Sequence, residues 1–433
     1  MLLKKERFIF QMHPLYQILA QASGREKVNP GEFIVTKVDL AEVNDLYLQV
    51  ILSFKEMKGT KVWDPQKIAF VMDHYAPAPT IKAAENQKKM REFAKEQGIK
   101  YFFDINRGVC HQVMPESGLV WPGMVLVATD SHTTTHGAFG AFSTGIGATD
   151  IAAVLLTGEI WFRVPEIIKI NIQGKIRKGV MAKDIILHII SQLGTDIALY
   201  KAIEFDGETV KEMSLDERLV LCNMSVEMGA KATYIRPDEK VREYLLDVNP
   251  EKYKEYEMMK LRDDESAADY ESVYHFDISN LEPQVTLPHR VDKVVSVLQA
   301  AGKPIQQALI GTCTGGRIND IKIAAQILKG KKICLSVRLL IIPASNKILK
   351  RCIELGYIQT LLDAGATLAT PSCGPCLGAH EGVLSPGESC ITASSRNFPG
   401  RMGSPEAKIF LSSPATVAAS ALKGVITDPR EFL

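Results

Sequence analysis

The sequence predicts an α/β fold, in which largely parallel sheets are covered by helices. Apolar runs of strand length alternate with helical patterns throughout the 433 residues. Several of these runs lead straight into polar side chains, which is typical of parallel strands whose carboxyl ends line a ligand crevice. A chain of this length exceeds one ordinary core, so we expect two or three domains.

The first third of the chain contains three predicted strands. Residues 68–72 form a buried apolar run that ends at Asp73 and His74. The runs at 100–104 and 124–128 follow, and the later one ends in Thr-Asp-Ser-His. Because the carboxyl ends of parallel strands meet at one edge of a sheet, we expect these polar residues to lie together.

Helical patterns separate these strands and continue beyond them. We expect a polar helix over 83–97, and later helices that begin near Ala182 and Asp216. A short apolar strand at 308–310 leads into a helix over about 318–328. This alternation supports the α/β class along the whole chain.

The pattern changes near residue 165, where a strand at 167–172 begins a new unit. The charged stretch 249–269 fits a solvated helix and loop, and 285–290 fits a connector into a last α/β unit. We therefore expect three α/β domains, which cover residues 1–165, 166–287 and 288–433.

The charge balance excludes several classes of partner. Lys and Arg number 51 against 50 Asp and Glu, a formal charge of +1, which gives no electrostatic reason to expect nucleic acid or an anionic membrane. Residues 1–7 carry charge where a signal peptide needs an apolar run, and no apolar stretch approaches the roughly 20 residues of a membrane span. Eight cysteines in so long a chain do not form a disulfide framework, so we expect a reduced, cytoplasmic protein.

Three cysteines in glycine-rich loops are the most informative feature of the chain. Cys313 lies in Ile-Gly-Thr-Cys-Thr-Gly-Gly-Arg, and Cys373 and Cys376 lie in Pro-Ser-Cys-Gly-Pro-Cys-Leu-Gly. Three thiolates suit an iron–sulfur cluster that lacks one protein ligand and leaves an iron open to substrate. An open metal can act as a Lewis acid on a hydroxyl or carboxylate. The pattern indicates a metal-dependent lyase and not an electron carrier.

Cys-x-x-Cys alone is a weak signal, and alternatives stay open. It also fits part of a zinc site or a redox dithiol, although further ligands at short spacing are missing and the pair lies in a loop late in the chain. The loop at 311–316 resembles a phosphate-binding loop without its Lys and hydroxyl residue. Cys110 is open because it precedes His111, and we expect the other cysteines to be inert core residues: Cys222, Cys334, Cys352 and Cys390.

Histidines beside carboxylates form a second set of candidates. A carboxylate bonded to one imidazole nitrogen fixes the tautomer and raises the basicity of the other nitrogen. Protonation of a departing hydroxyl needs such a tuned acid. Three of the nine histidines lie at strand ends in one third of the chain, which favours one shared site. The candidates are Asp73, His74, His111, Asp130, His132 and Glu227. We expect His13, His188, His275 and His289 to be structural or surface residues and leave His136 and His380 open.

Two arginines near the end of the chain are candidates for binding carboxylates. Arg396 and Arg401 flank a turn in Ser-Ser-Arg-Asn-Phe-Pro-Gly-Arg. Arginines in this arrangement suit bidentate contacts with a substrate carboxylate. The alternative is a surface loop with solvated arginines.

Together these stretches resemble the aconitase superfamily, and most closely its members with a separate large subunit, the isopropylmalate dehydratases and homoaconitases. The likeness runs from about residue 18 to residue 432. Four motifs in the same order carry it, at 129–140, 310–315, 372–378 and 396–401.

The resemblance implies one 4Fe-4S cluster held by Cys313, Cys373 and Cys376, with one iron that the protein does not ligate. It pairs Asp73 with His74, Asp130 with His111, and Glu227 with His132. It assigns substrate contacts to Ser131, Arg396, Arg401 and Asn44, and supporting contacts near the cluster to Asn223 and Ser395. The family usually has asparagine where this chain has Ser395, and the shorter side chain reaches less far.

The resemblance also implies an architecture and a reaction. The family fold has three α/β/α domains around the cluster. Because the chain stops at Leu433, we expect the swivelling fourth domain to be absent and a small subunit to supply it, in a heterodimer or heterotetramer. The implied reaction is dehydration and rehydration of a small hydroxy acid, with 2-isopropylmalate to 3-isopropylmalate in leucine biosynthesis as first choice. Homoaconitase and dimethylmalate- or citramalate-type dehydratases are alternatives, and a cluster-free RNA-binding protein is a remote one.

Overall fold

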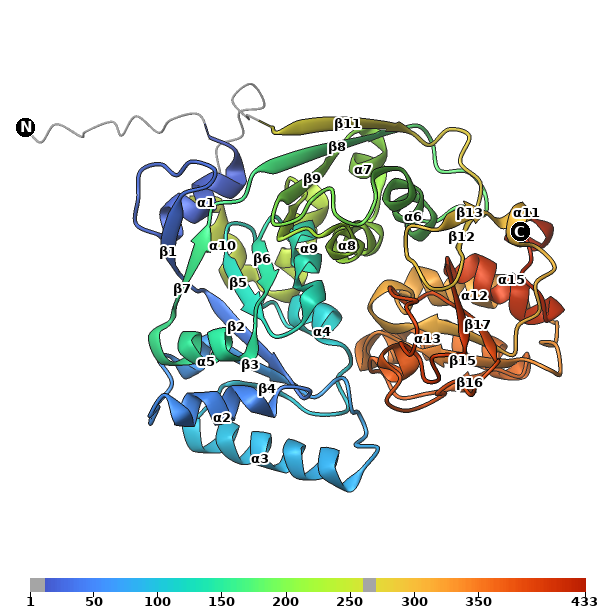
Figure 1. Cartoon of the computed structure of the whole chain (residues 1–433), viewed down its shortest axis with the longest axis horizontal. Helices are drawn as coiled ribbons and strands as arrows, with labels where there is room; N and C mark the ends of the chain where they lie inside the picture. Colours follow the sequence, from blue (N-terminus) through green and yellow to red (C-terminus); the bar gives the residue numbers. More distant parts are fainter. Residues whose placement is uncertain (1–11, 260–269) are drawn as a thin grey trace, which may run out of the picture.

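The computed structural model describes residues 12–259 and 270–433. The charged run at 1–7 and residues 260–269 of the predicted charged stretch lie outside the described residues. The α/β class is confirmed, because three sheets of mainly parallel strands are covered by helices (Figure 1). The division at residues 165 and 287 stays a prediction. Within the described residues, no helix combines the length and the apolar character needed to cross a membrane.

The first sheet has five parallel strands in the order β4-β3-β2-β5-β6. The strands predicted at 68–72, 100–104 and 124–128 are confirmed to within one residue at each end. The central strand β2 is not among the predicted ones. The strands are β2 (Leu40–Asn44), β3 (Ile68–Val71), β4 (Tyr101–Phe103), β5 (Val125–Ala128) and β6 (Phe142–Gly145).

Helices cover both faces of the first sheet. On one face, Phe54 and Phe93 from two helices pack with Phe70 of β3. The predicted polar helix is confirmed, and it ends at Gly98, whose φ of 68° suits glycine. This face carries α2 (Leu48–Glu56), α3 (Ile81–Gln97) and α5 (Ala148–Thr157), and the opposite face carries α4 (Cys110–Glu116) and the 3₁₀ segment Ser131–Phe139.

The second sheet has four parallel strands in the order β10-β9-β8-β11. The strand predicted at 167–172 and the helices predicted from Ala182 and Asp216 are confirmed. The strands are β8 (Ile167–Gln173), β9 (Ala202–Asp206), β10 (Ala232–Tyr234) and β11 (Ser272–Asp277). The helices around it are α6 (Ala182–Leu193), α7 (Glu208–Glu212), α8 (Leu215–Met224), α9 (Glu239–Val248) and α10 (Pro250–Met259). A separate antiparallel pair, β1 (Phe33–Lys37) with β7 (Glu159–Arg163), lies beside α1 (Pro14–Ala22).

The third sheet has seven strands in the order β13-β12-β18-β17-β14-β15-β16. Its last five strands in this order are parallel, whereas β12 is antiparallel to both of its neighbours. Residues 284–286 are therefore a strand, and the prediction of a plain connector at 285–290 is wrong at its start, because these residues pair with β18. The strands are β12 (Gln284–Thr286), β13 (Val294–Ser296), β14 (Gln307–Gly311), β15 (Arg338–Ile342), β16 (Thr367–Leu368), β17 (Ser389–Thr392) and β18 (Lys408–Ser412).

The helices of the third sheet include the one predicted at 318–328, which is confirmed. They are α11 (Val297–Ala300), α12 (Ile318–Leu328), α13 (Asn346–Glu354), α14 (Tyr357–Asp363) and α15 (Pro414–Lys423). One apolar cluster contains Leu126 of the first sheet, Ile168 of the second and Leu340 of the third. This shared core holds the edges of the sheets together around the cavity described next.

Candidate active site

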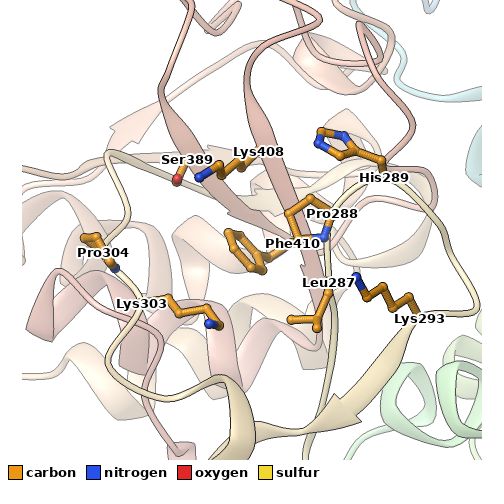
Figure 2. A pocket seen from close by; sticks show the side chains of 9 residues that line it. All are labelled: Leu287, Pro288, His289, Lys293, Lys303, Pro304, Ser389, Lys408 and Phe410. Atoms are coloured by element: carbon orange, nitrogen blue, oxygen red, sulfur yellow. The ribbon is translucent and has the colours of Figure 1, made fainter.

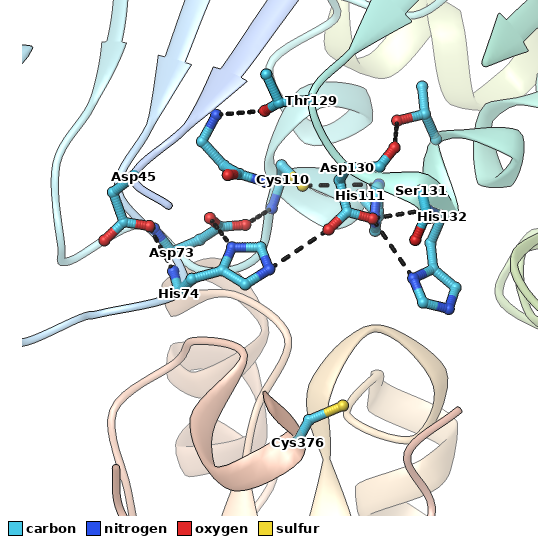
Figure 3. Close-up of polar contacts among 12 residues, drawn as sticks. Asp45, Asp73, His74, Cys110, His111, Thr129, Asp130, Ser131, His132 and Cys376 are labelled. Carbon is cyan, nitrogen blue, oxygen red and sulfur yellow. Dashed lines mark hydrogen bonds and ion pairs between the residues drawn. The ribbon is translucent and has the colours of Figure 1, made fainter. Parts of the chain in front are cut away.

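A cavity of about 340 Å³ lies where the carboxyl edge of the first sheet faces loops of the third sheet. Ten of the fifteen predicted site residues line it. One side, the histidine wall, consists of Asp73, His74, His111, Asp130 and His132. The other side, the cysteine wall, consists of Cys313, Cys373, Cys376, Ser395 and Arg401. Figure 3 shows the histidine wall gathered above Cys376, which comes from a separate segment of the chain.

His74 is held between two carboxylates. Its Nδ1 donates to Asp73 Oδ1 at 2.7 Å, and its Nε2 lies 3.4 Å from Asp130 Oδ2. Burial alone would lower the pKa of His74, but these two carboxylates outweigh it and raise the pKa well above its ordinary value. The two carboxylates therefore favour the protonated form of the His74 imidazole.

Asp130 is the centre of the histidine wall. His111 Nε2 donates to Asp130 Oδ1 at 3.0 Å, and the backbone N–H of His132 donates to the same oxygen at 2.7 Å. Burial would raise the pKa of Asp130, but the three surrounding histidines hold it well below its ordinary value. Asp130 is therefore an ionised carboxylate that orients three imidazoles at once (Figure 3).

The third histidine pair leads towards the arginines. His132 Nε2 donates to Glu227 Oε1 at 3.1 Å, and Arg396 Nε donates to the same oxygen at 2.6 Å. Arg396 Nη2 also donates to Ser131 Oγ at 3.0 Å. Burial would raise the pKa of Glu227, but His132 and Arg396 outweigh it and lower the pKa. All three predicted pairings of a histidine with a carboxylate are present, and Arg396 joins the last of them.

The three cysteines of the cysteine wall come from two loops of the third sheet, and Ser395 and Arg401 come from a third loop, after β17. Cys313 follows β14 in the 3₁₀ turn Thr312–Thr314, and Cys373 and Cys376 adjoin the 3₁₀ turn Gly374–Leu377. Thr312 has a φ of 64°, in the left-handed region that a threonine rarely adopts. The backbone N–H of Cys373 donates to the carbonyl of Asp73 at 2.9 Å, so the two walls are joined by the backbone.

The three thiols are buried and influence one another. A hydrogen bond from Cys373, helped by the Arg401 guanidinium, holds the pKa of Cys376 well below its ordinary value despite burial. The same hydrogen bond and burial raise the pKa of Cys373, and burial raises the pKa of Cys313 to about 11. Cys376 is thus the most easily ionised of three buried thiols that lie together, and a metal that bound them would displace their protons.

A model of the aconitase family, described as aconitate hydratase, matches residues 17–424. The chain belongs to the aconitase family. Membership in the aconitase family makes it part of a hydro-lyase and implies an iron–sulfur cluster.

Relatives within the aconitase family match nearly the whole chain. A probable 3-isopropylmalate dehydratase large subunit from Methanothermobacter thermautotrophicus is 49% identical over 95% of this chain and 97% of its own length. A 3-isopropylmalate dehydratase large subunit from Aquifex aeolicus is 46% identical over 96% of each chain. A probable methanogen homoaconitase large subunit, also from M. thermautotrophicus, is 46% identical over 97% of this chain and 98% of its own length. The solved structure of Thermococcus kodakaraensis aconitase X matches 88% of this chain and 89% of its own at 13% identity, with a TM-score of 0.48 that carries no weight here.

The cysteine wall fits the iron–sulfur cluster that the aconitase family implies. Three sulfurs from two loops meet in one cavity, which is the donor set that such a cluster needs. Four polar atoms beside them are buried and have no hydrogen-bond partner within the described chain: Thr312 Oγ1, Asn223 Oδ1, Ser395 Oγ and Arg401 Nε. Buried polar groups are normally paired, so these atoms indicate that a polar group completes the site.

Two predicted residues lie behind the cavity. Asn223 Nδ2 donates to Thr135 Oγ1 at 2.8 Å, and a hydrogen bond from the Asn223 side chain opposes the burial that raises the pKa of Cys313. Asn44 is fully buried, and neither amide atom of its side chain has a partner within the described residues. Asn44 does not line the cavity, and its predicted contact with substrate stays a prediction.

Asp45 is an important residue that the sequence did not reveal. Its Oδ1 accepts from the backbone N–H of His74 at 2.8 Å, and its Oδ2 accepts from Tyr75 N at 3.0 Å and from Gln87 Nε2 at 2.9 Å. Asp45 therefore fixes the loop that carries Asp73 and His74. It follows the end of β2, so the rule that polar residues at strand ends mark a site would have found it if β2 had been predicted.

The structure also decides several side predictions. Cys222, Cys352 and Cys390 are buried as predicted, but the prediction for Cys334 is wrong. Cys334 is partly exposed because it lies in the surface link between α12 and β15. His13 is buried and bonded to Glu204, as expected of a structural residue. Of the two histidines left open, His380 donates to the His74 carbonyl at 2.7 Å, and His136 is buried.

A second hollow, of about 770 Å³, lies on the third sheet and contains none of the predicted site residues (Figure 2). Three exposed lysines surround a floor that includes Leu287 and Phe410. The lysines are Lys293, Lys303 and Lys408. Although this hollow is the larger, it has no buried acid, base or thiol, so the chemistry is concentrated in the smaller cavity.

Proposed function

We propose that this chain is the large subunit of a 4Fe-4S hydro-lyase that converts 2-isopropylmalate to 3-isopropylmalate by dehydration and rehydration. The observation that carries this proposal is the single cavity in which three cysteines face three histidine–carboxylate pairs. The names of relatives that are 46–49% identical supply the substrate. The same reaction class suits an enzyme of leucine biosynthesis.

Cys313, Cys373 and Cys376 would hold the cluster in this proposal. With three protein ligands, one iron is left open, and the bound cluster supplies a Lewis acid for the substrate hydroxyl and a neighbouring carboxylate. The backbone bond from Cys373 to Asp73 fixes the cluster loop against the histidine wall. The protein thus brings its proton donors to the same space as its metal ligands.

His74 is the proposed acid that protonates the departing hydroxyl. Its Nδ1 is fixed by Asp73 at 2.7 Å, whereas its Nε2 has only a longer contact, of 3.4 Å, with Asp130, so Nε2 is the nitrogen that would deliver a proton. Its raised pKa keeps it charged at neutral pH, so it gives up the proton only to a group of growing basicity. His111 and His132 share Asp130 with it and complete a network that redistributes charge after the transfer.

Arg401 and Arg396 are the proposed partners of the substrate carboxylates. Arg401 Nε is buried and has no partner within the described residues, which leaves it ready to donate to an anion. Arg396 is bonded to Glu227 and Ser131, so it holds Ser131 at the rim of the site. Substrate binding would exchange part of this contact for a carboxylate oxygen.

A small subunit is the proposed partner. The relatives named large subunits are matched over 96–98% of their own length, so this chain spans nearly the whole length of a large subunit. The second subunit would close the open side of the cavity and supply further contacts to the substrate. A heterodimer and a heterotetramer both meet this requirement.

A homoaconitase is the second candidate function, because one relative of 46% identity carries that name. Both candidates use the same cavity, and they differ in the side chain of the acid that they rearrange. The deciding experiment is to purify the chain with its small subunit under anaerobic conditions and to assay isopropylmalate, homocitrate and citrate. Turnover of isopropylmalate supports the first proposal. Turnover of only the other two acids replaces it by the second, and a pair that binds no iron and sulfide overturns both.

A further inference from the structure

Lys183 is a buried lysine that connects the second sheet to the loops of the cysteine wall. It lies on α6, which packs against α8 and β12 between the second and third sheets (Figure 1). The residue is 1% exposed. Its Nζ donates to the Ser394 carbonyl at 2.7 Å, to the Ala393 carbonyl at 3.0 Å and to Thr314 Oγ1 at 3.2 Å. One amine therefore ties the residue after Cys313 to the two residues before Ser395.

Thr314 adds a further hydrogen bond between these two segments. Its hydroxyl accepts from Lys183 and donates to the Ala393 carbonyl at 2.7 Å. Met224 Sδ, from α8, lies 3.6 Å from Nζ. The ammonium group thus has oxygen and sulfur partners around it, and each of these partners is formally neutral.

Within the described residues, no carboxylate contacts the ammonium group of Lys183. Within the described chain its partners are two carbonyls, one hydroxyl and one thioether. A buried cation without an adjacent anion is costly, and burial lowers the pKa of Lys183 to about 8. A negative charge on Cys313 or Cys376 would oppose this fall the most, ahead of Asp320 and Glu227. The anion that best balances Lys183 is therefore on the cysteine wall.

We propose that Lys183 is a positioning residue for the iron–sulfur cluster, whose fixed positive charge lies beside the cysteine ligands and stabilises the negative charge of the ligated cluster. This inference rests on the proposed function, because it requires the cluster. Reduction adds one electron to the cluster. A fixed cation in a buried, low-dielectric site favours the more negative state, so Lys183 raises the reduction potential.

Two variants test this inference in the anaerobically reconstituted enzyme. Lys183→Met removes the charge and the donors, and Lys183→Gln removes the charge but keeps an N–H donor for the carbonyls. The reduction potential of the cluster is then measured by electron paramagnetic resonance during a redox titration. We expect both variants to lower the ratio of reduced to oxidised cluster at fixed potential at least tenfold, which is about 59 mV for one electron.

Arg218→Met is the matched control. Arg218 is also a buried cation, but its partners are the carbonyls of Val210 and Lys211 and the carboxylate of Asp238, none of which belongs to the cysteine wall. Its loss should destabilise the fold and leave the potential of the cluster unchanged. This control separates an electrostatic effect on the cluster from general loss of stability.

The outcomes distinguish the inference from the proposed function. A wild-type enzyme that takes up no cluster overturns both. A wild-type enzyme with a cluster, beside Lys183 variants of unchanged potential, overturns the inference alone. A folded Lys183→Gln chain that takes up no cluster, beside an Arg218→Met chain that does, supports the role of Lys183 by a second route.

Discussion

The two walls of the cavity differ in how far the polypeptide alone completes them. In the histidine wall, each imidazole has a carboxylate partner, and Asp130 serves all three. In the cysteine wall, Ser395 Oγ and Arg401 Nε are buried without partners within the described residues. In the folded chain, the acid–base groups of the histidine wall are therefore already paired with one another. Polar atoms of the cysteine wall remain without partners, so that wall is suited to bind a group that the chain does not itself provide.

The origin of each wall explains the difference. Two carboxylates of the histidine wall follow strands of one sheet, and a buried aspartate, Asp45, fixes the loop between β3 and α3. The cysteines of the cysteine wall lie in two loops about sixty residues apart, and Lys183 of α6 bonds the first of these loops to the loop that carries Ser395. A site assembled from distant loops has more to gain from a bound metal group that links them.

The largest loss of activity should come from substituting a cysteine of the cysteine wall. Cys313→Ser removes a soft ligand from the buried loop after β14, and oxygen is a poor substitute for sulfur towards iron. We expect the content of iron and sulfide to fall to near zero and the activity of the reconstituted enzyme to fall at least about a thousandfold, since metal chemistry supplies several kcal/mol of catalysis. Metal analysis, visible absorbance and turnover measure this.

Cys222→Ala is the control for that experiment. Cys222 is equally buried, but it lies on α8 and does not line the cavity. It should keep its cluster and most of its activity. If Cys313→Ser kept a full cluster, the assignment of the three ligands would be wrong, and the contrast between the walls would disappear.

The next effect should come from the proton donor of the histidine wall. His74→Asn removes the proposed acid, and activity should fall by about 10²- to 10⁴-fold, the usual contribution of general acid catalysis. The content of iron and sulfide should not change, because His74 is not a cluster ligand in this proposal. In the wild type, activity should decline as pH rises through the raised pKa of His74, since the donor then loses its proton.

His188→Asn is the matched control, because this half-buried histidine lies on α6 and does not line the cavity. It should leave both turnover and its pH dependence close to wild type. Loss of the cluster in His74→Asn would contradict the separation of the two walls, because the acid side would then hold the metal side together.

The sequence predicted the residues of both walls but not the residues that support them, Lys183 and Asp45. Asp73, Asp130 and the cysteines could be found because each follows a strand or lies in a glycine-rich loop, which is local information. Lys183 could not, because its oxygen partners lie 131 to 211 residues away. The central strand β2 escaped detection because Glu42 interrupts its apolar run, and a buried carboxyl is rarely expected there.

A substitution of Asp45 tests whether the histidine wall depends on the hydrogen bonds that fix its loop. Asp45→Asn replaces a carboxylate oxygen that accepts from Tyr75 and Gln87 with an amide nitrogen, which can only donate. We expect a loss of about 1–3 kcal/mol in the free energy of unfolding, because buried donors lose their acceptor. Activity should fall with it while the cluster remains bound. Denaturant unfolding and turnover measure the two effects.

Asp64→Asn is the control for Asp45. Asp64 also accepts a backbone N–H, from Gln66 at 2.9 Å, but in an exposed turn. It should change the free energy of unfolding by no more than about 0.5 kcal/mol. Equal losses in the two variants would mean that the loop of Asp73 and His74 needs no special support.

The only stabilising effect is expected at Glu42, beneath the histidine wall. Glu42 is 2% exposed between Ala69 and Ala128 of the neighbouring strands, and neither carboxyl oxygen has a partner within the described residues. Burial, followed by the charges of Asp73 and Asp130, raises its pKa well above the ordinary value. The folded protein therefore keeps a proton that the unfolded chain releases above its ordinary pKa.

Because the folded state binds more protons in that range, Glu42 lowers the stability progressively as pH rises from about 4.5 towards its raised pKa, by up to about 1.4 kcal/mol per pH unit. Glu42→Gln should remove this pH dependence but keep a buried polar group. Glu42→Met should remove both, so it should be the more stable variant by about 1–3 kcal/mol. Unfolding free energies at pH 5.5 and pH 8 separate the two effects. Variants that are less stable than the wild type at pH 8 would show that Glu42 has a partner that offsets its burial. The buried groups beneath the histidine wall would then be paired as fully as the histidines themselves.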